Sequence, residues 1–324
     1  MKVVFVLPSL DEIEAAAKIV YDHMPPTPQY RWEMLNQRLD VDLWLKHENH
    51  TPLGAFKVRG GLVYFDRLGE TPELKRGVIC ATRGNHGQSV AYAAAKYGLP
   101  TTIVVPHGNS KEKNEAMISL GANLVEAGND FQDALEHAEM LAEKESLHLV
   151  ASFHPLLVQG VATYSLELFR STQQLDVVYV PIGQGSGICG AISVRNALQL
   201  NTKIVGVVST EAAAYSKSFE AGIPIEVLAN TRIADGMACR RPNEQALEHI
   251  LSNVDRIVEV TDDEVEQAMR DLFECTHHVA EGAGAAAVAA VAKESIDLKG
   301  KTVAAILCGG NVDRSVFASI LMAG

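Results

Sequence analysis

Cysteines and aromatic residues are scarce in this chain of 324 residues, and long apolar runs are absent. Its five cysteines form no CxxC pair, so the sequence predicts neither a disulfide framework nor a structural zinc site. Lys and Arg total 28 against 40 Asp and Glu, and this excess of negative charge disfavours nucleic acid and anionic membranes as partners. No signal peptide or apolar stretch of membrane-spanning length is evident, which together with the unpaired cysteines predicts a cytoplasmic location.

The composition that is present is typical of a folded protein. Hydrophobic residues make up 47% of the chain and charged residues 21%, which excludes extended disorder. A chain of this length is expected to form one large α/β unit or two lobes with ample core.

From about residue 77 onward, short apolar segments alternate with amphipathic ones. The apolar segments are rich in Val, Ile and Ala, which is typical of parallel strands covered on both faces; they are 77–84, 101–106, 122–128, 147–152, 177–187, 203–210 and 302–311. Ligands of such sheets bind beyond the carboxyl ends of the strands. Three loops that contain glycine lie at such ends, at 82–88, 183–190 and 308–311, and we expect them to form the ligand site.

The glycine loop at 183–187 follows a predicted strand and precedes a predicted helix. Its backbone N–H groups and the positive end of the helix suit a phosphate group. Gly185 to Gly190 also matches GxGxxG, and Glu211 follows the next strand as a ribose-binding acid would, so a dinucleotide site is an alternative. The GK[ST] ending of a P-loop is absent, which disfavours nucleoside triphosphate hydrolysis.

Two further segments carry side chains suited to catalysis. Lys57 lies among apolar residues near the start of a predicted helix, and partial burial would lower its pKa and make its amine a nucleophile suited to a Schiff base. In the loop at 82–88, glycines allow close backbone approach and Asn85 offers a side-chain donor, a combination that suits a carboxylate. His86 alone is interpreted as an ordinary hydrogen-bonded histidine with no role in proton transfer.

Four segments in this order, 52–60, 82–88, 183–187 and 308–311, resemble the fold-type II pyridoxal phosphate enzymes, specifically the threonine/serine dehydratase and serine racemase group. The match extends across nearly the whole chain. The resemblance implies a tryptophan synthase β-like α/β fold of two lobes, each with a mostly parallel sheet flanked by helices. We expect a large cofactor-binding domain at 1–75 and 151–324, a small domain at 76–150, and assembly as a homodimer.

The resemblance also implies roles for individual residues. Lys57 would carry pyridoxal phosphate as a Schiff base and, once freed, remove the α proton of the substrate. Cys308 lies where relatives usually have serine or threonine beside the pyridine nitrogen, and a neutral partner there favours β-elimination over transamination. For Glu281, a place beside the cofactor ring and a plain role as the carboxylate at a helix N-terminus are equally open. The expected cofactor-binding residues are Phe56, Lys57, Asn85, Gly183, Gln184, Gly185, Ser186, Gly187, Glu281, Cys308 and Gly309, and the expected substrate-binding residues are Thr82, Arg83, Gly84, Asn85 and His86.

Three departures from the family pattern narrow the expected function. Thr82 and Arg83 stand where relatives usually have two serines, and the second serine is the acid/base of the racemases, so racemisation is expected to be minor. Val208 and Ala214 stand where metal-activated relatives have acids, so no metal is predicted there. The regulatory domain of longer biosynthetic threonine dehydratases is not present, so feedback inhibition of that type is not expected.

The resemblance therefore implies a pyridoxal phosphate-dependent ammonia-lyase with a small-molecule amino acid substrate. The default reaction is dehydration of a β-hydroxy α-amino acid, such as L-threonine or L-serine, to a 2-oxo acid and ammonia. Arg83 suits a bulkier or acidic substrate, so phenylserine and 3-hydroxyaspartate are alternative substrates. Arg83 could equally be an ordinary solvated loop residue with no part in substrate choice. Serine racemase and an NAD-dependent oxidoreductase are the alternatives from other classes.

Overall fold

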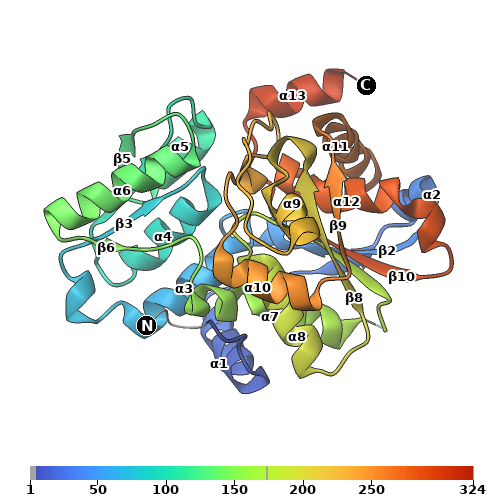
Figure 1. The fold of residues 1–324 in the computed structure, drawn as a ribbon, viewed down its shortest axis with the longest axis horizontal. Helices are drawn as coiled ribbons and strands as arrows, with labels where there is room; N and C mark the ends of the chain where they lie inside the picture. The colour runs from blue at the N-terminus through green and yellow to red at the C-terminus, as the bar shows by residue number, and fades with distance from the viewer. Residues whose placement is uncertain (1–4, 173, 324) are drawn as a thin grey trace.

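The computed structural model of the protein describes residues 5–172 and 174–323. Within these residues the strands form two sheets, one of six strands and one of four (Figure 1). No helix in that part of the chain is long and apolar enough to cross a membrane. The predicted α/β class with mostly parallel sheets is confirmed.

The six-stranded sheet has the order β1-β2-β10-β7-β8-β9. β1 pairs antiparallel with β2, whereas every other neighbouring pair in this sheet is parallel. β2 and β10 pair along their whole lengths although they lie near opposite ends of the chain, so this sheet needs both ends of the sequence. Its strands are β1 (Gln29–Arg31), β2 (Asp42–His47), β7 (Val177–Pro181), β8 (Lys203–Ser209), β9 (Arg256–Val260) and β10 (Thr302–Leu307).

The four-stranded sheet is parallel throughout and has the order β5-β4-β3-β6. Its strands are β3 (Val78–Ala81), β4 (Thr101–Val105), β5 (Asn123–Glu126) and β6 (His148–Leu149). All four lie inside the segment 76–150, while the domain boundaries drawn from the sequence stay a prediction.

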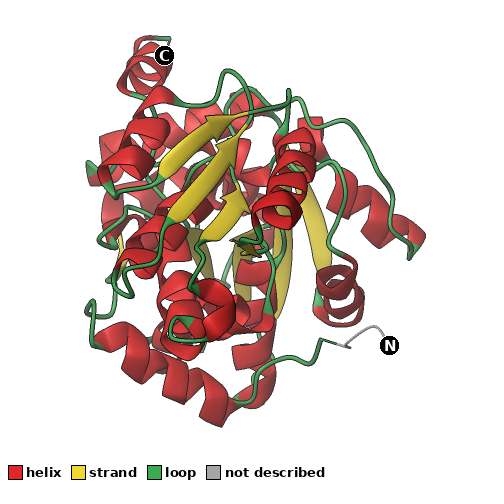
Figure 2. Ribbon diagram, turned by 90° about the vertical axis from the view of Figure 1, so that its left-hand side faces the viewer, coloured by secondary structure: helices red, strands yellow, loops and turns green. Residues whose placement is uncertain are grey.

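Helices enclose the strands, as Figure 2 shows. The Ala-rich helix α12 contacts β7, β8, β9 and β10, which explains why it carries small apolar residues almost throughout. α3 packs against both α4, which follows a strand of the four-stranded sheet, and α7, which precedes a strand of the six-stranded sheet. These two contacts join the two sheets. The helices are α1 (Leu10–Tyr21), α2 (Glu33–Leu39), α3 (Lys57–Leu68), α4 (Asn85–Ala95), α5 (Lys111–Ser119), α6 (Phe131–Glu145), α7 (Pro155–Ser171), α8 (Ser186–Ala197), α9 (Ala214–Ala221), α10 (Glu244–Asn253), α11 (Asp262–Thr276), α12 (Gly282–Lys293) and α13 (Arg314–Met322).

Candidate active site

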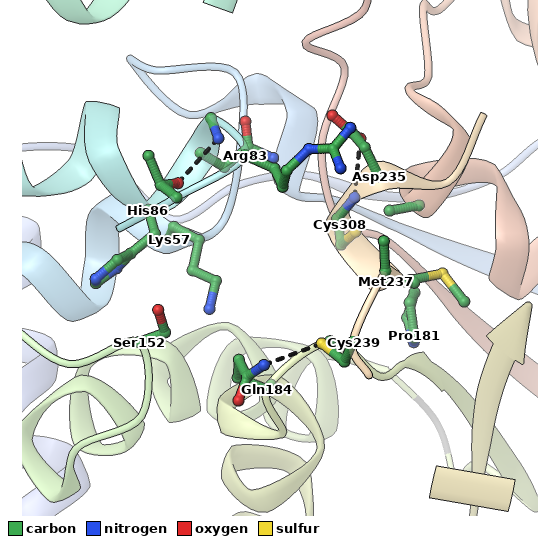
Figure 3. Close-up of a pocket in the computed structure, with 18 of the residues that line it drawn as sticks. Lys57, Arg83, His86, Ser152, Pro181, Gln184, Asp235, Met237, Cys239 and Cys308 are labelled. Carbon is green, nitrogen blue, oxygen red and sulfur yellow. Dashed lines mark hydrogen bonds between the residues drawn. The ribbon is translucent and has the colours of Figure 1, made fainter. Parts of the chain in front are cut away.

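A pocket lies where the loops after β3, β7 and β10 meet the start of α3 (Figure 3). Every residue expected from the sequence to bind cofactor or substrate lines this pocket except Gly309, which follows the lining residue Cys308 and forms a β-bridge with Ala55. The pocket also has lining residues that the sequence did not indicate: Lys113, Phe131, Ser152, Pro181, Asp235, Gly236, Met237, Ala238, Cys239 and Ala283.

Lys57 is the first residue of α3, and its amine points into the pocket (Figure 3). Nζ lies 3.2 Å from the hydroxyl of Ser186 on the opposite wall. Removal of the amine from water lowers the pKa of Lys57 to about 8. Compared with an ordinary lysine, a much larger fraction of this amine is therefore neutral and nucleophilic near neutral pH.

The turn before Lys57 is held by the two residues that follow β10, Cys308 and Gly309. The backbone N–H of Phe56 donates to the carbonyl of Cys308 at 3.0 Å, and Ala55 forms a β-bridge with Gly309. The Thr51 hydroxyl bonds to both the N–H and the carbonyl of Ala55. These contacts fix the position of Lys57 relative to the end of β10.

The loop at 183–187 forms a tight turn from β7 into α8. Gly185 has φ +97°, a left-handed conformation that favours glycine, and a Cβ there would lie 2.5 Å from Cβ of Ala246. The hydroxyl of Tyr215 donates to the carbonyl of Gln184 at 3.1 Å and holds the loop from outside. The first turn of α8 has N–H groups without helical partners, so this loop is suited to bind an anion.

Cys308 contributes a neutral thiol to the pocket. Burial, with a further contribution from Glu281, holds its pKa well above the ordinary value for a thiol. The predicted neutral group at this position is therefore present, as a protonated sulfur that is a weak hydrogen-bond partner.

Glu281 lies at the centre of a buried polar network. Its Oε1 accepts a 2.6 Å hydrogen bond from the Asn85 side chain, and Oε2 lies 3.1 Å from Nζ of Lys113. Its side chain does not cap α12, so the structure favours the position beside the pocket over the capping role. Burial raises the pKa of Glu281, Asp235 raises it further, and Lys113 offsets part of this increase.

Lys113 reaches this network from α5, beside the four-stranded sheet. It donates to Asp235 at 2.7 Å and is almost completely buried. Burial favours the neutral amine, but Asp235 and Glu281 outweigh that effect and raise the pKa of Lys113 above its ordinary value. Lys113 and Asp235 could not be predicted from the sequence, because each lies in a segment of ordinary polar pattern.

Arg83 lies at the junction of the pocket with a smaller cavity beside it. Its Nε is buried and has no hydrogen-bond partner among the described residues. The smaller cavity is lined by Arg83, Asp130, Phe131, Gln132, Gln184, Ala229, Ala238, Arg240 and Arg241. Two of its arginines are already paired, Arg240 with Asp130 at 2.8 Å and Arg241 with Glu244 at 2.7 Å. Arg83 is the cation of this cavity for which no ion pair is found among the described residues.

Two other residues of the 82–88 loop have structural roles. The Thr82 hydroxyl accepts hydrogen bonds from the N–H groups of Gly84 and Gly87, which stabilises the turn into α4. His86 is buried, with Nε2 3.4 Å from the carbonyl of Val150, and burial lowers its pKa to about 3. A neutral, buried His86 agrees with the sequence prediction that it transfers no proton.

The pocket fits pyridoxal phosphate in the chemistry of its walls. An amine of lowered pKa, a glycine loop at a helix N-terminus and a neutral thiol face one space, as the aldehyde, phosphate and pyridine nitrogen of that cofactor require. A Cβ on Gly187 would lie 3.2 Å from the Tyr164 hydroxyl, so the loop has little space for any larger residue.

Comparisons with known proteins agree with this chemistry. The family model described as "Pyridoxal-phosphate dependent enzyme" matches residues 20–309. L-threonine ammonia-lyase of Thermotoga maritima is 33% identical over 317 residues, which are 98% of this chain and 79% of the relative. L-threo-3-hydroxyaspartate ammonia-lyase of Saccharomyces cerevisiae is 30% identical over 98% of this chain and 97% of its own length.

Solved structures show the same fold. Processed threonine deaminase isoform 2 of Solanum lycopersicum superposes with a TM-score of 0.86 and 29% identity, covering 99% of this chain and 96% of that one. Several bacterial biosynthetic L-threonine dehydratases are longer, and the chain spans 58–60% of their length.

These matches confirm the fold and the cofactor expected from the order of the motifs, and the names of the relatives agree with the expected ammonia-lyase class. They favour a phosphate-binding role for the 183–187 loop over the dinucleotide alternative. Since the family model covers most of the sequence, the chain belongs to the family of pyridoxal phosphate-dependent enzymes.

Proposed function

We propose that the protein dehydrates a β-hydroxy α-amino acid, L-threonine or L-serine by default, to a 2-oxo acid and ammonia. The observation that carries this proposal is the amine of Lys57, with a pKa of about 8, facing the glycine loop and the neutral thiol of Cys308 across one pocket. The relatives named as threonine and 3-hydroxyaspartate ammonia-lyases support the reaction class.

Each wall of the pocket has a proposed role in holding the cofactor. Lys57 binds it covalently, the 183–187 loop binds its phosphate, and Asn85, Glu281 and Cys308 contact the ring. Bound there, pyridoxal phosphate supplies an electron sink that makes the Cα–H bond of an amino acid acidic.

Lys57 acts on the substrate as a base once the substrate amine has displaced it from the cofactor and left its own amine free. Its neutral amine takes the α proton, and the electrons of the broken Cα–H bond form a Cα=Cβ bond while the C–O bond to the β-hydroxyl breaks. The hydroxyl leaves as water, and the proton that Lys57 took from Cα balances the one that the leaving hydroxyl takes up. The released enamine tautomerises and is hydrolysed by water, which yields the 2-oxo acid and ammonia.

The 82–88 loop is proposed to bind the substrate carboxylate. The N–H groups of the first turn of α4 and the short turn held by Thr82 suit an anion. A guanidinium group does not readily transfer a proton, so Arg83 does not replace the serine that serves the opposite face of Cα in racemases. Dehydration should therefore greatly exceed racemisation, and chiral analysis of residual serine during turnover measures the ratio.

The test of the proposed function uses the purified protein with pyridoxal phosphate. Borohydride reduction followed by peptide mapping should place the cofactor on Lys57, and 2-oxo acid should form from threonine or serine. Lys57→Ala should lose both the covalent label and turnover. Labelling at another lysine would refute the assignment of Lys57, and a labelled protein that releases no 2-oxo acid from any β-hydroxy amino acid would refute the reaction.

A second candidate substrate class is a β-hydroxy amino acid with a larger or anionic side chain. Arg83 favours it, because this side chain lines both the main pocket and the cavity beside it and its buried Nε has no partner among the described residues. The yeast relative is named for 3-hydroxyaspartate. The comparison of kcat/KM for serine, threonine, phenylserine and 3-hydroxyaspartate decides between the two classes.

We also propose a cytoplasmic homodimer. The five cysteines are all unpaired and buried, which suits a reducing compartment. Light scattering on the purified protein tests the dimer, and cell fractionation tests the compartment.

A further inference from the structure

Three histidines outside the cofactor pocket lie together at the carboxyl end of β2. His47 ends that strand, His50 ends the short turn after it, and His278 comes from the segment between α11 and α12. One ring nitrogen from each lies within 4.8 Å of the other two, and the ring centroids are 4.7–5.0 Å apart. The fold thus brings together imidazoles from distant parts of the sequence.

Two buried ring nitrogens of this cluster make no hydrogen bond within the described residues. His47 is completely buried, and its Nδ1 has no hydrogen-bond partner among the described residues. Nδ1 of His278 is likewise buried and without a partner there. Buried polar atoms normally have a partner, so two such nitrogens at one place indicate a missing ligand.

We propose that His47, His50 and His278 bind one divalent transition metal ion of the zinc, nickel or copper type. Three neutral imidazoles without a carboxylate suit these ions and not magnesium or calcium, which prefer oxygen ligands. The site is distinct from Val208 and Ala214, the positions at which the sequence argued against a cation.

Binding requires a local contraction. With metal–nitrogen distances of about 2.0–2.1 Å, ligand nitrogens in a tetrahedral site lie roughly 3.3 Å apart, closer than the 4.8 Å limit of this cluster. His50 is exposed and can supply this movement by a change of side-chain rotamer. A water molecule is expected as the fourth ligand.

One hydrogen bond opposes the metal. The indole N–H of Trp32 donates to Nε2 of His47 at 2.9 Å, which places the ring proton on Nδ1. Coordination through Nδ1 requires that proton to move to Nε2, so the Trp32 hydrogen bond must break. The proposal therefore predicts that Trp32→Phe, which keeps the aromatic packing and removes the donor, tightens metal binding.

The experiment is calorimetric titration of the untagged holoenzyme with zinc chloride, after removal of free pyridoxal phosphate. We expect one zinc per chain. His50→Gln and His278→Gln should each weaken binding roughly tenfold or more, because each removes a ligand. Trp32→Phe should strengthen binding about two- to tenfold, the worth of one neutral hydrogen bond.

His107→Gln is the matched control, since His107 is exposed, lies just after β4 of the four-stranded sheet and is close to Glu126. Its zinc affinity should equal that of the wild type. A rise in melting temperature with zinc in the wild type, absent in His278→Gln, would support the site independently. Equal zinc affinity in the wild type and His278→Gln, or no binding at millimolar zinc, would overturn the proposal.

Discussion

Lys57 becomes a nucleophile through its surroundings alone. The Ser186 hydroxyl lies 3.2 Å from its Nζ, and the pocket provides no carboxylate in direct contact with this amine among the described residues. Desolvation is therefore the dominant effect on its pKa. An acid beside Nζ would stabilise the charged amine and oppose attack on an aldehyde.

Covalent attachment of pyridoxal phosphate to the cofactor-free protein should accordingly depend on pH. Only the neutral amine attacks, so the attachment rate should rise about tenfold per pH unit below the pKa of about 8 and level off above it. Stopped-flow absorbance after mixing with pyridoxal phosphate measures this rate. A rise that continues to pH 10 would mean that Lys57 keeps an ordinary pKa.

Arg83 tests substrate selection at the scale of one side chain. Arg83→Ser removes a cation that lines both the main pocket and the smaller cavity beside it. If Arg83 contacts an anionic substrate, kcat/KM for 3-hydroxyaspartate should fall roughly ten- to a hundredfold, equivalent to about 1.5–3 kcal/mol, while serine turnover changes less.

Arg232→Ser is the control for this prediction, because Arg232 is exposed and lines neither cavity. It should leave the kcat/KM ratios of the four substrates unchanged. Equal ratios in Arg83→Ser and the wild type would show that Arg83 takes no part in selection.

At the scale of elements, the site is built from turns between a strand and the following helix. β3 leads into α4 and β7 leads into α8, and each turn presents the N-terminal N–H groups of a helix to the same pocket. The two turns place two anion-binding loops on different sheets, which suits a cofactor phosphate on one side and a substrate carboxylate on the other.

Gly185→Ala tests the turn into α8. The new Cβ would meet Ala246 at 2.5 Å and the Tyr215 hydroxyl at 3.1 Å, in addition to the strain of a left-handed backbone. We expect the affinity for pyridoxal phosphate to fall tenfold or more, roughly the effect of 1–3 kcal/mol of strain in the loop. Fluorescence titration of the cofactor-free protein measures the affinity.

Gly222→Ala separates crowding from backbone strain. Gly222 also has a positive φ, +71°, but no atom lies within 4 Å of the position of its Cβ. This variant should lose some stability and keep its cofactor affinity. Equal cofactor affinities in the two alanine variants would contradict a phosphate-binding role for the loop.

Local patterns explain how much of the site could be predicted from the sequence. Lys57, Asn85 and the 183–187 loop each lie at a strand end or helix start, so composition and neighbouring glycines indicate them directly. Lys113 and Asp235 meet Glu281 only after the two sheets pack together, and neither lies in a distinctive local pattern. Such long-range contacts depend on tertiary structure, which a single sequence does not reveal.

A second buried network was missed for the same reason. Arg59 bonds through its guanidinium to Glu48 at 2.7 Å and to Glu167 at 2.6 Å, and Lys46 also pairs with Glu167. All these side chains are nearly or completely buried. The group contains two positive and two negative side chains, so its charges balance. It joins β2, α3 and α7 and fixes the helix that begins with Lys57.

Across the whole molecule, the two sheets are joined by ion pairs and hydrogen bonds around the pocket. The Ser110 side chain bonds to Asp313 near the C-terminal helix. Arg240 pairs with Asp130 at 2.8 Å at another edge. Lys113 forms a third, buried link between the two sheets, because it reaches from α5 beside the four-stranded sheet to Asp235 and Glu281.

Lys113→Met should destabilise the protein and change how its stability depends on pH. Removal of the cation leaves the buried Glu281 and the partly buried Asp235 without it, and loss of one partner of a buried pair typically costs about 3–5 kcal/mol. The pKa of Glu281 is already raised by burial, and without Lys113 it should rise further. A group whose folded pKa exceeds its unfolded value contributes stability at low pH and loses it as the pH rises through the folded pKa.

The variant should therefore lose more unfolding free energy than the wild type between pH 5 and pH 8, as urea denaturation at the two pH values would measure. Lys111→Met, at an exposed position on the same helix, should match the wild type at both. Adding Glu281→Gln to Lys113→Met removes the buried negative charge and retains an oxygen for Asn85, so the steep pH dependence should disappear. If Lys113→Met alone has the pH dependence of the wild type, the ion pair with Glu281 does not link the two sheets.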